Sequence, residues 1–150
     1  MKIKPEQLND QLSKGLKSIY LVFGAEILLV EKSLQAIKDS AVASGFGERV
    51  RYDVDGHSSW DEIIANISSP SLFAEKRIVE LRLTTGKVGV KGSKAITLLA
   101  TSLPDDVLLI VSAGKLDMAQ QKSKWFKALD QNGTIIQHWE VQSEQLVGWI

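Results

Sequence analysis

The sequence predicts an α/β domain built on an open, mainly parallel five-stranded sheet with helices on both faces. Two observations support this prediction: short apolar or alternating segments recur along the chain, and segments with helical periodicity separate them. Strands joined by helical crossovers run parallel. The five expected strands cover residues 18–23, 49–55, 76–83, 107–111 and 134–139.

Length and composition indicate one domain with its own core. The chain has 150 residues, of which 44% are hydrophobic, and a chain of this size buries roughly 70% of its unfolded surface. Eighteen basic and 18 acidic residues balance, so we expect DNA only as an indirect partner. The absence of cysteine excludes disulfides and thiolate sites. No apolar run is long enough to span a bilayer, so we expect a cytoplasmic protein without membrane contact.

The first 45 residues predict a short helix, a buried strand and a long helix. Pro5 suits a first helical position, and leucines follow at a spacing of four. Residues 18–23 are continuously apolar, as in a strand buried on both faces. Residues 25–44 then carry apolar side chains at helical spacing, and Gly45 is the expected left-handed cap.

The glycine between that strand and the long helix is a candidate phosphate-loop residue. A phosphate loop needs Gly, four residues, and then Gly-Lys-Ser/Thr, so that backbone amides and the lysine reach the phosphates. Counted from Gly24, those places hold Leu29, Val30 and Glu31. We therefore expect a structural turn without a bound cofactor. The alternative is a small nucleotide- or phosphometabolite-handling α/β enzyme that uses the turn at Gly24.

A helix-to-strand corner in the middle of the chain carries an apolar pair. Residues 49–55 alternate, as in a half-covered strand, and residues 59–67 have the spacing of an amphipathic helix. Pro70 ends that helix and leaves Leu72 and Phe73 at the corner. Such a pair either folds under the loop into the core or stands out as an anchor for a partner.

The following segments complete the alternation of strands and helices. Charges at every second or third place predict that the strand 76–83 is partly open to solvent. The glycine-rich basic stretch 84–92 predicts a flexible, solvated loop that could contact phosphates. Helices are expected over 93–103 and 115–130, the second capped by Asn132-Gly133. Neither strand 76–83 nor strand 107–111 ends in the carboxylates that ATP hydrolysis needs.

The chain ends within an expected helix. Ser143 is its predicted cap, and it is still apolar at Ile150. We therefore expect residues 1–140 to form the domain, residues 141–150 to begin a truncated helix, and the sequence to be a piece of a longer protein.

His57 and His138 are the only histidines and lack metal-ligand spacing, so we expect neither a metal nor catalytic residues.

The corner sequence resembles a known binding loop. Ser71-Leu72-Phe73, preceded by a short helix and followed by Ala74-Glu75-Lys76-Arg77, is similar to the clamp-binding loop of the delta subunit family of the bacterial DNA polymerase III clamp loader. The collinear order of further segments extends the resemblance over nearly the whole chain. These segments are Tyr20-Leu21-Val22-Phe23-Gly24 with Leu28-Leu29, Leu108-Leu109-Ile110-Val111, and Trp125-Phe126-Lys127-Ala128-Leu129.

The resemblance implies both a fold and a mechanical function. The fold would be a degenerate AAA+ domain, which is RecA-like and of P-loop type. Leu72 and Phe73 would enter an apolar pocket on the sliding clamp, the beta subunit of the polymerase, with Ser71, Pro70 and Ser68 as further contacts. The family commonly has Gln at the place of Ser68.

The implied role is to help open the clamp ring for loading onto primed DNA during replication. The domain itself would have no enzymatic activity, although it would belong to a DNA-directed DNA polymerase, a nucleotidyltransferase. Missing C-terminal domains would join it to the other clamp-loader subunits. The helix 59–68 and either Lys76 or Arg77 are expected to add contacts to the clamp.

Overall fold

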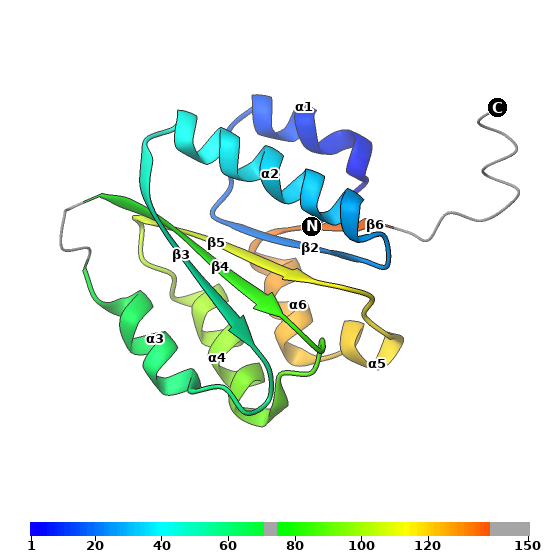
Figure 1. Cartoon of the computed structure of the whole chain (residues 1–150), viewed down its shortest axis with the longest axis vertical. Coiled ribbons are helices and arrows are strands. Elements are labelled where there is room, and N and C mark those ends of the chain that lie inside the picture. Colours follow the sequence, from blue (N-terminus) through cyan, green and yellow to red (C-terminus); the bar gives the residue numbers. More distant parts are fainter. Residues whose placement is uncertain (71–74, 139–150) are drawn as a thin grey trace, which may run out of the picture.

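A computed structural model describes residues 1–70 and 75–138 and shows a single parallel sheet between two layers of helices (Figure 1). The order of its six strands is β1-β6-β2-β5-β4-β3, and every neighbouring pair is parallel. The strands are β1 (Lys2–Ile3), β2 (Ile19–Gly24), β3 (Phe46–Val54), β4 (Lys76–Leu83), β5 (Val107–Ala113) and β6 (Thr134–His138).

Helices cover both faces of this sheet, as the sequence predicts. They are α1 (Leu8–Ser13), after a 3-10 turn η1 (Pro5–Gln7), then α2 (Ile27–Ala43), α3 (Trp60–Ser68), α4 (Gly89–Thr101), α5 (Met118–Gln121) and α6 (Lys124–Asn132). Helices α1 and α2 lie on one face, and α3, α4 and α6 on the other (Figure 1). Strands β2 and β5 are buried over their whole lengths and separate two apolar cores. No helix of the described ranges is long and apolar enough to cross a membrane.

The prediction of five strands is wrong, because β1 adds a sixth. Lys2 and Ile3 pair with Ile135 and Ile136 of β6. The N-terminal ammonium lies 3.0 Å from Asp130 and helps to hold this short strand in place. Two residues are too few to show strand periodicity, and the partner strand lies more than 130 residues away in the sequence.

The prediction that the strand 76–83 is partly open to solvent holds only near its two ends. In β4 only Lys76 and Arg82 are exposed. The buried Glu80 forms an ion pair with Lys38 of α2 at 3.0 Å, and the buried Arg77 bonds to α3. Both buried charges of the strand therefore have partners on the covering helices.

Several element boundaries differ from the predicted ones. Helix α4 begins within the glycine-rich stretch, at Gly89 rather than residue 93, and the predicted helix 115–130 divides into α5 and α6. Helix α6 starts after Ser123, whose hydroxyl accepts a hydrogen bond from the Phe126 amide. Strand β3 begins three residues before the predicted 49, and β6 is described as far as His138, so Trp139 and the helix expected from Ser143 lie outside the described residues.

The two predicted glycine caps have different outcomes. Gly45 has a φ of +97°, which confirms the left-handed cap of α2. Gly133 has an extended φ of −150°, so it is not such a cap. A Cβ at Gly133 would lie 2.7 Å from the Cβ of Ile19, which shows that close packing on β2 requires glycine there.

Candidate functional site

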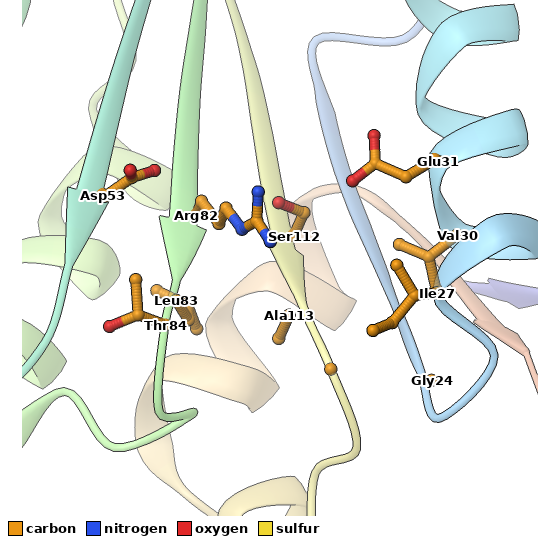
Figure 2. Close-up of a pocket in the computed structure, with 11 residues that line it drawn as sticks. Gly24, Ile27, Val30, Glu31, Asp53, Arg82, Leu83, Thr84, Ser112 and Ala113 are labelled. Carbon is orange, nitrogen blue, oxygen red and sulfur yellow. The ribbon is translucent and has the colours of Figure 1, made fainter.

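A cavity of about 480 Å³ opens where β2, β4 and β5 end, on the α2 side of the sheet (Figure 2). In open α/β sheets, ligands bind at the carboxyl ends of neighbouring strands whose connections leave toward opposite faces. Strand β2 leads into α2 on one face, whereas its neighbour β5 leads toward α6 on the other. The cavity therefore lies at the position where such a sheet would hold a nucleotide.

The turn at Gly24 does not have the form of a phosphate loop. Only Ala25 and Glu26 separate β2 from α2, so the residues counted as Leu29, Val30 and Glu31 already belong to the helix. A Cβ at Gly24 would lie 2.2 Å from the carbonyl oxygen of His138. Glycine is required here because the turn packs against the end of β6, which is a structural reason unrelated to phosphate.

The charges around the cavity do not favour a polyphosphate. Figure 2 shows the Arg82 guanidinium extending from β4 over β5, with the Glu31 carboxylate beside α2 and Asp53 on the far side of β4. Asp53 also accepts a hydrogen bond from Arg51 Nε at 3.0 Å. Two carboxylates and one arginine line this space, so it offers no excess of positive charge.

The two histidines have the structural roles that the sequence predicts. The backbone amide of His57 donates to the carboxylate of Asp55 in an exposed turn. His138 is buried in β6, its Nε2 lies 2.7 Å from the hydroxyl of Ser33, and burial lowers the pKa of His138. Within the described ranges, no group of three or more His, Cys, Asp or Glu side chains could hold a metal ion.

The α3–β4 corner lies at the opposite, amino-terminal edge of β4. Ser68 ends α3, and Ser69 leaves the helix in an extended conformation with a φ of −74° and a ψ of 142°. Ser68, Ser69 and Pro70 are all exposed. The other three predicted contact residues, which are Ser71, Leu72 and Phe73, lie outside the described residues.

Arg77 fixes this corner from the strand side. Its guanidinium donates to the carbonyl oxygens of Asn66 at 3.2 Å, Ile67 at 2.9 Å and Ser69 at 2.8 Å. Because Arg77 is buried and holds the end of α3, Lys76 is the accessible one of the two basic residues that the sequence offers as a clamp contact. The sequence holds one signal for this role. A basic side chain that follows a helix can bond to the carbonyl oxygens at the end of that helix, which have no partner within the helix.

Lys76, the other basic candidate, remains exposed. Its ammonium lies 5.5 Å from the centre of the Phe46 ring, over the start of β3. Lys76 is therefore accessible beside the corner, whereas Arg77 is not.

Comparison with known proteins matches this chain to one family. The family model described as DNA polymerase III, delta subunit, matches residues 20–138. DNA polymerase III subunit delta of Escherichia coli (strain K12) is 32% identical over 150 residues, which cover 100% of this chain and 44% of the relative. The Haemophilus influenzae protein of the same name is 33% identical over 152 residues, covering 99% and 44%.

Two solved structures share the fold. The DNA clamp loader delta protein of Bacillus subtilis has a TM-score of 0.70 at 19% identity, covering 97% of this chain and 45% of that protein. A DNA polymerase III gamma subunit-related protein from Thermotoga maritima has a TM-score of 0.54 at 11% identity, covering 93% and 47%. At these identities the likeness concerns the fold alone.

The sheet and the matched relatives together indicate a domain of the DNA replication machinery. Because the family model covers well over half of its residues, the chain belongs to the DNA polymerase III delta subunit family. It spans about 44% of the length of the curated relatives reported above.

Proposed function

We propose that this chain is the clamp-binding, N-terminal part of a longer clamp-loader delta subunit. Residues 1–140 form a degenerate AAA+ domain, which is RecA-like and of P-loop type, and residues 141–150 begin the next helix. Relatives more than twice as long support the proposal that the chain is part of a longer protein. A gene whose stop codon follows Ile150 would contradict it.

The proposed action is mechanical. The domain grips the sliding clamp through Leu72 and Phe73 and helps to open the ring for loading onto primed DNA during replication. The α3–β4 corner is the observation that supports this proposal most directly. Arg77 holds the end of α3 against β4, and the exposed Ser68 and Pro70 lead directly into the apolar pair.

Two apolar anchors are not enough for binding on their own. Burying side chains of this size yields about 1.5–3 kcal/mol each, whereas association costs an estimated 4–15 kcal/mol. Further contacts with the clamp come from Ser68, Pro70, Ser71 and the exposed face of α3. That face carries Asp61, Glu62, Ala65 and Asn66.

The alternative, a nucleotide-handling enzyme at Gly24, has less support. The two-residue turn and the two carboxylates near the cavity argue against a bound polyphosphate. We propose instead a cytoplasmic subunit without enzymatic activity of its own, in a complex that acts as a DNA-directed DNA polymerase. Its partners are the clamp and, through the remainder of the chain, the other clamp-loader subunits, and it meets DNA only indirectly.

Binding of the purified chain to the sliding clamp of the same organism tests this function. The double variant Leu72→Ala/Phe73→Ala should bind more than about tenfold more weakly, because central apolar anchors dominate such interfaces. Its melting temperature should stay nearly unchanged if the pair is exposed. A buried pair would lose about 2–5 kcal/mol at each position.

The matched control removes two exposed apolar side chains elsewhere. Val90 and Leu98 on α4 are 74% and 50% exposed, so Val90→Ala/Leu98→Ala should change neither stability nor clamp binding. A large drop in the melting temperature of the Leu72/Phe73 variant would assign the pair to the core. Unchanged stability together with unchanged clamp affinity would remove the corner from the mechanism.

A further inference from the structure

The glycine-rich basic stretch 84–92 has no part in the proposed function, yet it forms one wall of a groove. This groove of about 580 Å³ lies between the start of α4 and the start of α6, on the face of the sheet opposite α2. The side-chain Nε2 of Gln120 donates to the carbonyl oxygen of Gly86 at 2.7 Å and joins α5 to the β4–α4 connection. The groove is therefore preformed, which lowers the cost of binding a partner there.

The groove carries an excess of positive charge. Lys87, Lys94 and Lys124 line it and are all exposed, and none of them forms an ion pair with another described residue. Asp117 is the single carboxylate among the described lining residues, and it already accepts a hydrogen bond from the Gln120 amide at 2.8 Å. The cavity beside Gly24 differs, because carboxylates are in excess there. The groove thus attracts negatively charged groups.

Apolar side chains accompany these charges. Val90 lines the groove and is 74% exposed, and Leu98, two turns further along α4, is 50% exposed. Val90, Lys94 and Leu98 repeat at intervals of four, so they lie along one side of the helix over about 12 Å. The buried Val88 and Trp125 add apolar lining within the groove. A partner would therefore meet both cations and apolar groups.

We propose that the groove and this side of α4, which we call the α4–α6 surface, bind an acidic amphipathic helix of a partner protein. Such helices bind grooves through apolar anchors three, four and seven positions apart. The distance from Val90 to Leu98 suits two anchors separated by two turns, and acidic side chains beside them would pair with the three lysines. The proposal does not rest on clamp binding, because no described residue of the α3–β4 corner lines the groove.

A protein helix fits this surface better than a nucleic acid does. Phosphate and sugar contacts come from basic and polar side chains and from backbone amides, so the exposed Val90 and Leu98 would gain little from them. Single strands also need accessible aromatic rings on which bases stack. The aromatic ring in the lining, that of Trp125, is buried and offers no such platform.

Titration with a designed peptide tests the proposal. The probe is a helix of about 14 residues, nearly four turns, with leucine at positions i, i+4, i+7 and i+11 and glutamate beside them. Fluorescence anisotropy of the labelled peptide would measure its affinity for the 150-residue chain and for the full-length protein from the same gene. We expect saturable binding to both. Replacing the glutamates of the peptide with glutamine should weaken binding at least about tenfold, because the pairs with the lysines are lost.

A charge reversal locates the peptide on the protein. Lys94→Glu should weaken binding at least about tenfold, because it places a negative charge opposite the glutamates of the peptide. Lys32→Glu is the matched control, at an exposed position of α2 on the opposite face of the sheet, and should change affinity by less than about twofold. Both positions are exposed, so the melting temperature should stay nearly unchanged in each variant.

Removal of the apolar anchors separates this surface from the clamp contact. Val90→Ala/Leu98→Ala should bind the peptide at least about tenfold more weakly while keeping its affinity for the clamp. Leu28→Ala/Val42→Ala removes two apolar side chains of α2 that are 84% and 56% exposed, and in the 150-residue chain it should keep its affinity for the peptide. A failure of the clamp proposal would leave both of these peptide results unchanged.

Four results would overturn the proposal. The first is the absence of saturable peptide binding up to about 1 mM. The second is an equal loss in Lys94→Glu and Lys32→Glu, which would mean that the peptide binds elsewhere. The third is tighter binding of an oligothymidine of about 12 nucleotides that Lys94→Glu abolishes and Val90→Ala/Leu98→Ala does not, which would assign the lysines to a nucleic acid. The fourth is binding to this chain but not to the full-length protein, which would show that the rest of the protein covers the groove.

Discussion

Arg77 at the start of β4 donates from Nη2 to the carbonyl oxygen of Ile67 at 2.9 Å, which joins the last turn of α3 to the strand that follows it. Two further carbonyls, those of Asn66 and Ser69, accept from the same guanidinium. Both ends of the segment that carries Leu72 and Phe73 are thus held by one buried cation. Arg77 therefore holds the described residues that lead into the segment 71–74.

Replacing Arg77 with methionine should destabilise the domain. Methionine fills a similar volume but leaves the carbonyl oxygens at the end of α3 without their donor. A buried acceptor left unpaired costs about 1–3 kcal/mol, so denaturant unfolding should show a loss of at least that size. Clamp affinity should fall as well, because the corner is no longer fixed.

Arg82→Met is the matched control, since Arg82 lies on the same strand and is exposed. It should change the free energy of unfolding by less than about 0.5 kcal/mol. If Arg77→Met were as stable as Arg82→Met, the guanidinium would not be what holds the corner.

Gly24→Ala should destabilise the chain because of a steric clash, in addition to the cost of a side chain at its positive φ of +154°. The added Cβ would lie 2.2 Å from the backbone oxygen of His138, and backbone atoms have little freedom to move away. Overpacking of this kind costs about 1–3 kcal/mol, measurable by denaturant unfolding. Gly15→Ala provides the comparison, because Gly15 also has a positive φ, +131°, but a Cβ there meets nothing within 4 Å; equal losses in the two variants would refute the steric explanation.

ATP with Mg²⁺ should not raise the melting temperature. A ligand at about 100 times its dissociation constant would add about 2.7 kcal/mol of stability, which differential scanning calorimetry detects readily. Glu31→Gln removes one carboxylate from the cavity and should still give no shift, because the two-residue turn provides no phosphate loop. A shift in either protein that is lost on substitution at Gly24 would restore the nucleotide-binding alternative.

The stability of the fold should fall in mildly acidic solution because of His138. Burial lowers its pKa from the ordinary value of 6.5, so the folded state stays neutral at pH values where the unfolded chain takes up a proton. The unfolded state then binds more protons, and stability rises with pH in that range. The loss of folding stability should therefore begin as the pH falls below about 6.5. It should level off below the pKa that His138 has in the folded state.

Urea unfolding over a series of pH values would measure this dependence. His138→Asn should remove the histidine-linked part of it, whereas His57→Asn, at an exposed position, should keep it. If His138→Asn kept the full pH dependence, another group would have to be responsible.

Periodicity predicted most of this fold from the sequence. The apolar strand at residues 18–23, the long helix after it and the cap at Gly45 follow local rules that apply before the chain folds. The spacing after Gly24 also anticipated a turn without a phosphate loop, and the structure supplies the missing reason, which is the contact with His138.

The remaining features depend on contacts between distant residues, which local patterns do not show. Strand β1 exists because β6 offers it an edge, and Glu80 is buried because Lys38 reaches it from α2. The role of Arg77 required knowing where α3 ends relative to β4. Leu72 and Phe73 lie outside the described residues, so their assignment as clamp anchors stays a prediction that rests on sequence resemblance.

The outer strand β3 bears on the tendency of the protein to aggregate at high concentration. It is nine residues long, and among the strands of the described residues it pairs with β4 alone, so it forms an outer edge of this sheet. Such edges can recruit strands from other molecules and start aggregation. Arg49, Arg51 and Asp53 are exposed along β3, and an incoming strand would have to strip water from these charges. Charged side chains along an edge strand oppose sheet extension, so this edge is a poor template for backbone pairing between molecules.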